Sequence, residues 1–425
     1  MPDLQTLLLQ VSIISVTAYS IGWLLSKFHQ PRVVGEMVAG LLLGPSLLGW
    51  LAPNLSAALF PPQSLSLLYA LSQIGLLLFM FLVGLELDTK QLRQLGHVAI
   101  VISHTSIIAP FLLGVWLAFH LYARLAEAGT SFSGFVLFMG AAMSVTAFPV
   151  LARILNERNL LGTRLGTLTI ACAAVDDVTA WCLLAGILAI VHSKLNHLPI
   201  WLMLSGFGVY LALMLLVLRP LARSFVARHR ANASHTVITA LLLCMLASSL
   251  ATEWLGIHAL FGAFFAGVMM PKEKVFTEAI REKFRPLVMV LLIPLFFAFT
   301  GLRTNIGLIR GPEMVAYCAI VFIVAVAGKF GGSMLAARIM GTPWREATAI
   351  GILMNTRGLI ELVILNIGLD VGILPRPLFS MMVLMAIGTT LMTTPLLVLV
   401  YGNPEASKQF NIGRNPSEAS LNTVK

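Results

Sequence analysis

The chain has 425 residues, of which 58% are hydrophobic and only 11% are charged. A soluble domain carries about 25% charged residues, so this composition excludes an ordinary globular protein and indicates a membrane protein throughout. The formal charge of +10 does not indicate a nucleic-acid partner, because the basic residues lie in short segments between apolar runs and not on one face or tail.

Thirteen apolar runs predict an all-α integral membrane fold. A bilayer core of roughly 30 Å requires about 20 mainly apolar residues per helix. In chain order, the predicted spans cover residues 4–26, 33–50, 64–85, 97–122, 132–154, 162–192, 199–218, 235–253, 256–270, 286–301, 314–337, 346–368 and 377–401. We expect residues 1–401 to form one transmembrane domain and residues 402–425 to form a polar cytoplasmic tail.

The Lys and Arg residues are unequally divided between alternate loops of this thirteen-helix arrangement. With the N-terminus outside, 21 of the 28 Lys and Arg residues fall in cytoplasmic loops and the tail, and five fall in outer loops. Short cytoplasmic loops carry the excess of basic residues in membrane proteins. We therefore expect an outer N-terminus and a cytoplasmic C-terminus.

An odd number of spans allows two six-helix halves around a linker helix at 199–218, entering the membrane in opposite senses. In such inverted repeats, substrates bind near the midplane, where corresponding helices of the two halves are interrupted. The fifth span contains Ser144-Val145-Thr146-Ala147-Phe148-Pro149, and the twelfth contains Asn355-Thr356-Arg357-Gly358. Polar side chains beside Pro or Gly predict two broken helices whose free backbone groups face an ion.

Asp176 and Asp177 are adjacent in the middle of the sixth span. Each charge at that depth costs a few kcal/mol, so a structural pair neutralised by basic neighbours is the less favoured interpretation. Two adjacent carboxylates repel when both are ionised, so we expect at least one of them to exchange protons near neutral pH. A buried carboxylate that binds either a proton or a cation is the minimum device for exchanging H+ against Na+ or K+.

Three more charged residues inside predicted spans extend this candidate site. Lys329 is central in the eleventh span and requires an anionic partner. Pairing with Asp176 would leave Asp177 free for the ion; a lysine that snorkels to the interface is the alternative. Arg357 and Glu361 are four residues apart on the twelfth span, where we expect a structural ion pair, with tuning of transport as the alternative.

Other patterns exclude functions or predict packing. No P-loop, HExxH or convincing GxSxG element is present, so neither ATP-driven transport nor a familiar hydrolase is indicated, and we expect neither an enzyme nor a cofactor. The four cysteines lie inside apolar runs without the spacing of a zinc site. Gly40 and Gly44 form a GxxxG match, which is suited to close helix packing.

Eight runs form a combination typical of one family. They read VVGEMVAGLLLGPSLLG, LLLFMFLVGLELD, SVTAFPVLARIL, AAVDDVTAW, GIHALFGAFFAGVMMP, PLFFAFTGLRTNI, AGKFGG and MNTRGLIELVILNIG. Together they resemble the monovalent cation:proton antiporter-2 family, which includes NapA-type Na+/H+ antiporters, plant cation/H+ exchangers and Kef-type transporters. The similarity covers essentially residues 10–400.

The resemblance implies inverted repeats with broken crossing helices and a homodimer. It also implies an elevator-like movement of a core part, at 97–192 and 314–401, against a dimerisation part at 4–85 and 235–301. By position, Asp177 matches the ion- and proton-binding aspartate, and Asp176 matches its neighbour. Lys329 matches the lysine that pairs with this neighbour in electrogenic members, whereas electroneutral relatives have Asn-Asp. Ser144 and Thr146 match broken-helix residues near the ion.

We therefore expect an electrogenic antiporter in a bacterial inner membrane, which exchanges Na+ for H+ without a cofactor and contributes to pH homeostasis. A K+/H+ antiporter of the same fold is the first alternative, because the MNTRGLIELVILNIG and PLFFAFTGLRTNI runs look most like plant exchangers, several of which move potassium. A sodium-coupled organic anion symporter is less favoured, since it would not need two aspartates and a buried lysine.

Overall fold

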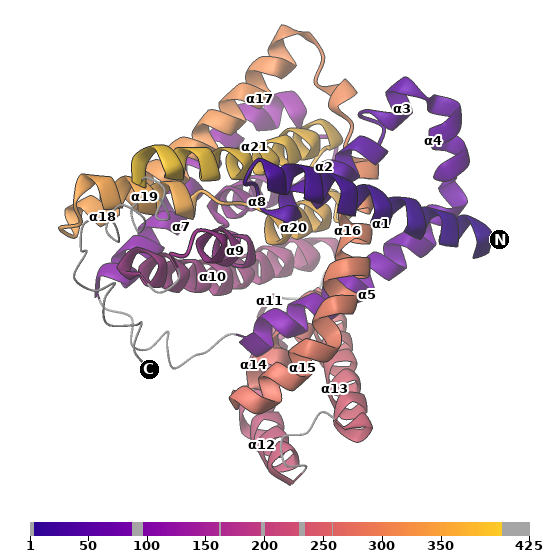
Figure 1. The fold of residues 1–425 in the computed structure, drawn as a ribbon, viewed down its shortest axis with the longest axis vertical. Coiled ribbons are helices and arrows are strands. Elements are labelled where there is room, and N and C mark those ends of the chain that lie inside the picture. The colour runs from indigo at the N-terminus through magenta and orange to yellow at the C-terminus, as the bar shows by residue number, and fades with distance from the viewer. Residues whose placement is uncertain are drawn as a thin grey trace, which may run out of the picture.

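The computed structural model describes residues 4–86, 97–160, 163–196, 200–228, 234–256 and 258–401, and these residues contain helices but no strand. The first half comprises α1 (Leu4–Lys27), α2 (Arg32–Leu43), α3 (Leu48–Leu51), α4 (Pro53–Leu59), α5 (Pro62–Glu86), α7 (His97–Leu125), α8 (Phe132–Ser144), α9 (Phe148–Glu157) and α10 (Arg164–Asn196) (Figure 1). The second half comprises α11 (Ile200–Leu213), α12 (Arg219–Arg228), α13 (His235–Trp254), α14 (Ala259–Met269), α15 (Lys274–Leu287), α16 (Ile293–Arg303), α17 (Gly311–Val326), α18 (Gly332–Ile339), α19 (Trp344–Met354), α20 (Leu359–Asp370) and α21 (Arg376–Tyr401).

In the described part of the chain, three π-helical turns join consecutive helices without a loop. They are η1 (Met214–Leu218) between α11 and α12, η2 (Val288–Leu292) between α15 and α16, and η4 (Ala327–Gly331) between α17 and α18. A 3-10 turn, η3 (Ile306–Leu308), follows α16. Single π-helical turns inside α-helices are often found at functional sites, and η4 contains Lys329.

The predicted all-α, multi-pass membrane fold is confirmed. Among the described residues, 11 helices are long and apolar enough to cross a membrane, and the bent pair α19 and α20 would make twelve. Each of the thirteen predicted spans overlaps one of these or the shorter helix α14. Because α14 has only 11 residues, the count of thirteen and the inverted repeat remain predictions. The predicted tail at 402–425 lies outside the described residues.

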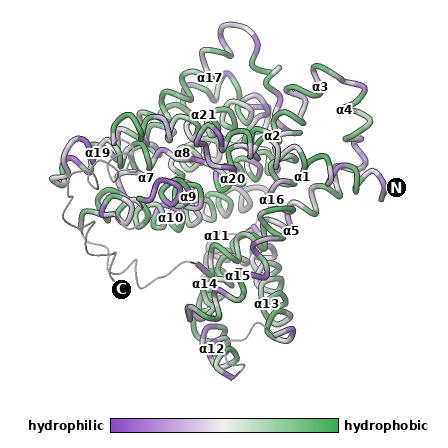
Figure 2. The backbone as a smooth tube through the Cα atoms, viewed as in Figure 1, coloured by the Kyte–Doolittle hydropathy of each residue, from purple (hydrophilic) through white to green (hydrophobic). Residues whose placement is uncertain are grey.

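The outer surface of the bundle is apolar. Trp116, Leu216 and Trp254, for example, are 53%, 76% and 79% exposed. A soluble protein exposes large apolar side chains singly and not over an extended surface. Figure 2 shows hydrophobic residues along most of the length of the helices. A surface of this kind fits contact with lipid chains.

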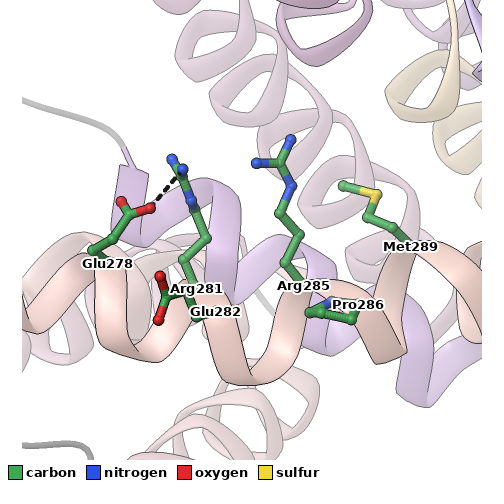
Figure 3. A pocket seen from close by; sticks show the side chains of 6 residues that line it. All are labelled: Glu278, Arg281, Glu282, Arg285, Pro286 and Met289. Carbon is green, nitrogen blue, oxygen red and sulfur yellow. Dashed lines mark hydrogen bonds and ion pairs between the residues drawn. The ribbon is translucent and has the colours of Figure 1, made fainter.

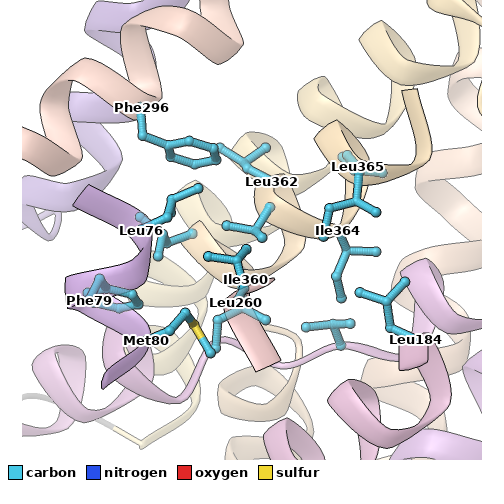
Figure 4. Close-up of a cluster of buried hydrophobic side chains, with 14 of the residues drawn as sticks. Leu76, Phe79, Met80, Leu184, Leu260, Phe296, Ile360, Leu362, Ile364 and Leu365 are labelled. Carbon is cyan, nitrogen blue, oxygen red and sulfur yellow. The ribbon is translucent and has the colours of Figure 1, made fainter. Parts of the chain in front are cut away.

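The helices form two sets that meet at a common apolar core. In one set, α2 packs against α1 and α16, and α14 packs against α5 and α13. In the other, α7 packs against α8, α10, α17 and α18, and α19 packs against α18 and α21. Leu76, Leu260 and Phe296 from the first set are buried in the same apolar cluster as Leu184 on α10 and Ile360 on α20 (Figure 4).

Glycines allow the backbones of α2 and α16 to touch. A Cβ atom on Gly301 would lie 1.9 Å from the carbonyl oxygen of Gly40, and one on Gly44 would lie 2.1 Å from the carbonyl oxygen of Gly301. Both distances are far below van der Waals contact. The close packing predicted for the GxxxG match is therefore present, and α16 is its partner.

The helix that contains the tenth predicted span, 286–301, begins before residue 286. The helix runs without interruption from Lys274 through η2 to Arg303. Its first part, α15, is amphipathic. Phe276 and Ile280 are fully buried on one face. The polar face lines a surface pocket (Figure 3), which is formed by Glu278, Arg281, Glu282, Arg285, Pro286 and Met289. A search for continuous apolar runs excludes such a segment because half of its residues are charged or polar.

Candidate ion-binding site

Two helices are broken where the sequence predicted interruptions, and the breaks contact each other. The helix α8 ends at Ser144, the chain is extended at Val145, and α9 begins at Phe148. The helix α19 ends at Met354, and α20 begins at Leu359 after an angle of 43°. The backbone N–H of Ala147 donates to the carbonyl of Thr356 at 2.9 Å.

Asp176, on α10 beside this crossing, has a complete set of hydrogen-bond donors. Ser103 Oγ donates to its Oδ1 at 2.9 Å. Its Oδ2 accepts from Ser106 Oγ at 2.7 Å, Thr146 Oγ1 at 2.9 Å and Lys329 Nζ at 2.7 Å. The side chains of Asp176 and Lys329 are both 0% exposed. Four donors, one of them a cation, fit an ionised carboxylate.

Asp177 differs from its neighbour because its carboxylate has no hydrogen-bond partner among the residues that the structure describes. The residue is 3% exposed, and neither of its carboxylate oxygens accepts a hydrogen bond. An ionised carboxylate left in this state is costly, so a proton or a bound cation would stabilise it.

Lys329 is positioned by glycines that bring η4 against α7. A Cβ on Gly328 would lie 2.7 Å from Cα of Pro110, and one on Gly332 would lie 2.8 Å from Cβ of Ala109. From this position Nζ also donates to the carbonyls of Ser106, at 2.9 Å, and of Ser144. The lysine therefore points into the bundle and does not snorkel to the interface.

Cationic side chains satisfy the carbonyl groups at the broken end of α8. Arg357 donates to the carbonyls of Ala142 at 3.0 Å and Met143 at 2.7 Å, and Lys329 donates to that of Ser144. Arg357 also forms the expected ion pair with Glu361, at 2.5 Å, and both side chains are 0% exposed. Positive charge at a helix C-terminus is favourable because the unpaired carbonyls carry partial negative charge.

The structure thus brings together the sequence-predicted residues, with one change of role. Ser144 contributes its backbone carbonyl, because its hydroxyl donates to Ala141 O within its own helix. Sequence analysis missed Ser103 and Ser106, since two serines three residues apart in an apolar helix form no recognisable motif. Their role at the site would have been indicated only by knowing that both serines lie on the helix face that packs against the sixth span.

Among the described residues, no group of three or more His, Cys, Asp or Glu side chains could hold a metal ion. The site instead combines carboxylates, hydroxyls and the free backbone groups of two broken helices. This combination is typical of secondary transporters that bind ions at discontinuous helices.

Comparison with known proteins gives the family. Residues 13–399 match the family described as "Sodium/hydrogen exchanger, transmembrane", and the chain belongs to this family. The chain is accordingly a membrane transporter of the cation/proton antiporter class. The predicted family resemblance is confirmed.

Named relatives differ in length. A Na(+)/H(+) antiporter, NhaS4, from Synechocystis is 44% identical over 95% of this chain and 99% of its own length. Cation/H(+) antiporter 17 of Arabidopsis thaliana is 43% identical over 94% of this chain but 48% of its own length. K(+)/H(+) antiporter 1 of Saccharomyces cerevisiae is 35% identical over 88% of this chain and 44% of its own length. The chain therefore spans about half of the plant and yeast relatives.

A solved structure shares the fold. The sodium proton antiporter MjNhaP1 from Methanocaldococcus jannaschii aligns with a TM-score of 0.64 over 93% of this chain and 98% of its own, at 12% sequence identity. At this identity, the match concerns the fold alone.

Proposed function

We propose that this antiporter exchanges Na+ for H+ at Asp177. The observation that carries the proposal is the contrast between the two aspartates: Asp176 has four donors, whereas Asp177 is buried with both oxygens unpartnered. A carboxyl group in this state is stabilised by a proton or by a dehydrated cation, but not by both at once. Mutually exclusive binding is the requirement for antiport.

In this mechanism, the ion pair of Lys329 and Asp176 adds a second proton to the exchange. When a cation enters between the two carboxylates, Lys329 releases Asp176 and loses its proton, while Asp177 loses its own. Two proton equivalents are then exchanged for one Na+, and transport is electrogenic. The ion pair of Lys329 and Asp176 at 2.7 Å supports this sequence of events, because a buried lysine without its anion is stabilised by becoming neutral.

The movement that carries the site across the membrane is elevator-like in this proposal. The core part, 97–192 and 314–401, moves against a dimerisation part, 4–85 and 235–301, with the linker helix 199–218 between them. The two sets of packed helices support this division. The protein would act as a homodimer in a bacterial inner membrane, with the N-terminus outside, the C-terminus in the cytoplasm and a role in pH homeostasis.

Sodium is proposed over potassium because the Synechocystis relative, which matches along nearly its whole length, is named as a Na(+)/H(+) antiporter. A K+/H+ antiporter is the second candidate, since the yeast relative is named for that exchange. A symporter of an organic anion is disfavoured by the negative charge of two carboxylates at the site.

The test is transport by the purified protein in liposomes that contain a pH-sensitive dye. An imposed pH gradient would be challenged in turn with Na+, Li+, K+ and Rb+. We expect Na+ and Li+ to collapse the gradient at concentrations at which K+ has no effect. A response to K+ and Rb+ alone would replace the sodium assignment with the potassium one, and no response to any of the four would refute cation/proton exchange.

A further inference from the structure

Ser103 and Ser106 are two side chains of α7 that contact the ion site. They are three residues apart and thus lie on one face of the helix. Both are 0% exposed, and both donate their hydroxyl hydrogen to Asp176, one to each carboxylate oxygen.

Each hydroxyl around Asp176 has a second acceptor within reach. Ser106 Oγ is 2.8 Å from the carbonyl oxygen of Ser103, and Ser103 Oγ is 3.5 Å from that of Cys172. Thr146 Oγ1 is 3.1 Å from the carbonyl oxygen of Met354. A hydroxyl group carries a single hydrogen, so it donates to the carboxylate or to the carbonyl, but not to both.

The choice of acceptor decides what the hydroxyl oxygen offers to the site. When the hydrogen points at Asp176, the hydroxyl helps to hold the carboxylate as an anion. When it points at the backbone carbonyl, a lone pair of the hydroxyl oxygen turns toward the carboxylate, where a cation would need oxygen ligands. Rotation of a hydroxyl exchanges one hydrogen bond for another, so neither state leaves a buried group unpaired.

We propose that Ser103 and Ser106 act with Thr146 as a hydroxyl switch that lets Asp176 exchange the ammonium of Lys329 for the transported cation. This structure has Lys329 Nζ at 2.7 Å from Oδ2 of Asp176, and in this lysine-bound state the proposal has the three hydroxyls donating to Asp176. In the cation-bound state they donate to their backbone carbonyls, and the oxygens of Ser106 and Thr146 become ligands of the dehydrated cation at Oδ2. Ser103, which contacts Oδ1, positions the carboxylate.

The inference rests on the proposed function, and its test uses the same liposome assay on the full chain. We expect Ser106→Ala to raise the apparent KM for Na+ about tenfold and to leave the maximal rate within about twofold, because one ligand of the bound cation is lost while the exchanging aspartate remains. Ser103→Ala should raise KM by a smaller factor, roughly threefold. Ser106→Cys should resemble Ser106→Ala, since a thiol preserves the size of the side chain but is a poor ligand for a hard cation.

Ser72→Ala is the matched control. Ser72 is also fully buried, and its hydroxyl donates to the carbonyl three residues earlier, as that of Ser106 can, but it lies on α5 away from the aspartates. An unchanged KM in both Ser106 variants, with exchange by the wild type intact, would overturn the inference and leave the proposed function standing. Absence of exchange by the wild type would refute the proposed function itself. A KM raised equally by Ser72→Ala would also overturn the inference, because the effect would then come from lost packing.

Discussion

The backbone N–H of Ala147 lies 2.9 Å from the carbonyl oxygen of Thr356, so the two broken helices are joined by a main-chain hydrogen bond at their interruptions. Nearby, Arg357, which lies in the break between α19 and α20, donates hydrogen bonds to the carbonyls at the C-terminal end of α8. Each break thus supplies partners for the backbone groups that the other leaves free. Such mutual satisfaction allows irregular backbone to exist inside a membrane protein.

The first prediction concerns Arg357. Its replacement by Ala would leave Glu361 as an unpaired buried charge and would free the carbonyls of Ala142 and Met143. Breaking a buried pair in this way costs about 3–5 kcal/mol, so we expect a large fall in melting temperature or loss of folded protein. Thermal unfolding in detergent, followed by intrinsic fluorescence, measures the effect.

Arg153 provides the control for that experiment. It forms an ion pair with Glu157 at the same spacing of four residues, but both side chains are more than a third exposed. We expect Arg153→Ala to cost at most about 1 kcal/mol. Equal melting temperatures for the Arg357 and Arg153 variants would contradict a structural role for the buried pair.

The sequence was sufficient to predict the helical fold, both interruptions and the buried charges, because each has a local signal. Apolar runs indicate spans, Pro and Gly beside polar residues indicate breaks, and Asp176, Asp177 and Lys329 are conspicuous in apolar surroundings. Ser103 and Ser106 could not be predicted, since their role depends on which helix faces theirs. The start of the helix at Lys274 was also missed, because the burial of Phe276 and Ile280 against other helices, and not continuous hydrophobicity, stabilises α15.

A second prediction concerns the contact between α2 and α16. A Cβ at Gly40 would lie 2.1 Å from the carbonyl oxygen of Phe297, so Gly40→Ala must push the two helices apart. We expect a loss of about 1–3 kcal/mol or more, seen as a lower melting temperature. Gly208→Ala, on α11, meets nothing within 4 Å and should be neutral or slightly stabilising, because alanine favours helix more than glycine does. Equal stability of both variants would show that the two helices separate at no cost.

Membrane orientation supplies a third prediction. The excess of Lys and Arg in alternate loops of the predicted thirteen-helix arrangement predicts an outer N-terminus and a cytoplasmic C-terminus. Reporter tags fused to the two ends should therefore respond on opposite sides of the membrane. Two tags on the same side would imply an even number of spans, which is incompatible with the proposed inverted repeat.

A fourth prediction is that transport moves net charge. Two carboxylates and one lysine allow two protons to be exchanged for each Na+, and each net charge couples to the membrane potential by about 2.3 kcal/mol per 100 mV. A sudden rise in Na+ over proteoliposomes on a supported membrane should therefore give a transient current. Exchange detected by the pH dye without any such current would mean that Lys329 keeps its proton throughout the cycle.

The central claim, that Asp177 is the residue at which proton and cation compete, is tested most directly by Asp177→Asn. Asparagine preserves the size of the side chain but cannot be ionised, so it binds neither a proton nor a cation by charge. We predict that the variant elutes as a folded dimer in size-exclusion chromatography and gives no cation-dependent proton flux in liposomes. Appreciable Na+-dependent proton flux in the folded variant would contradict the account.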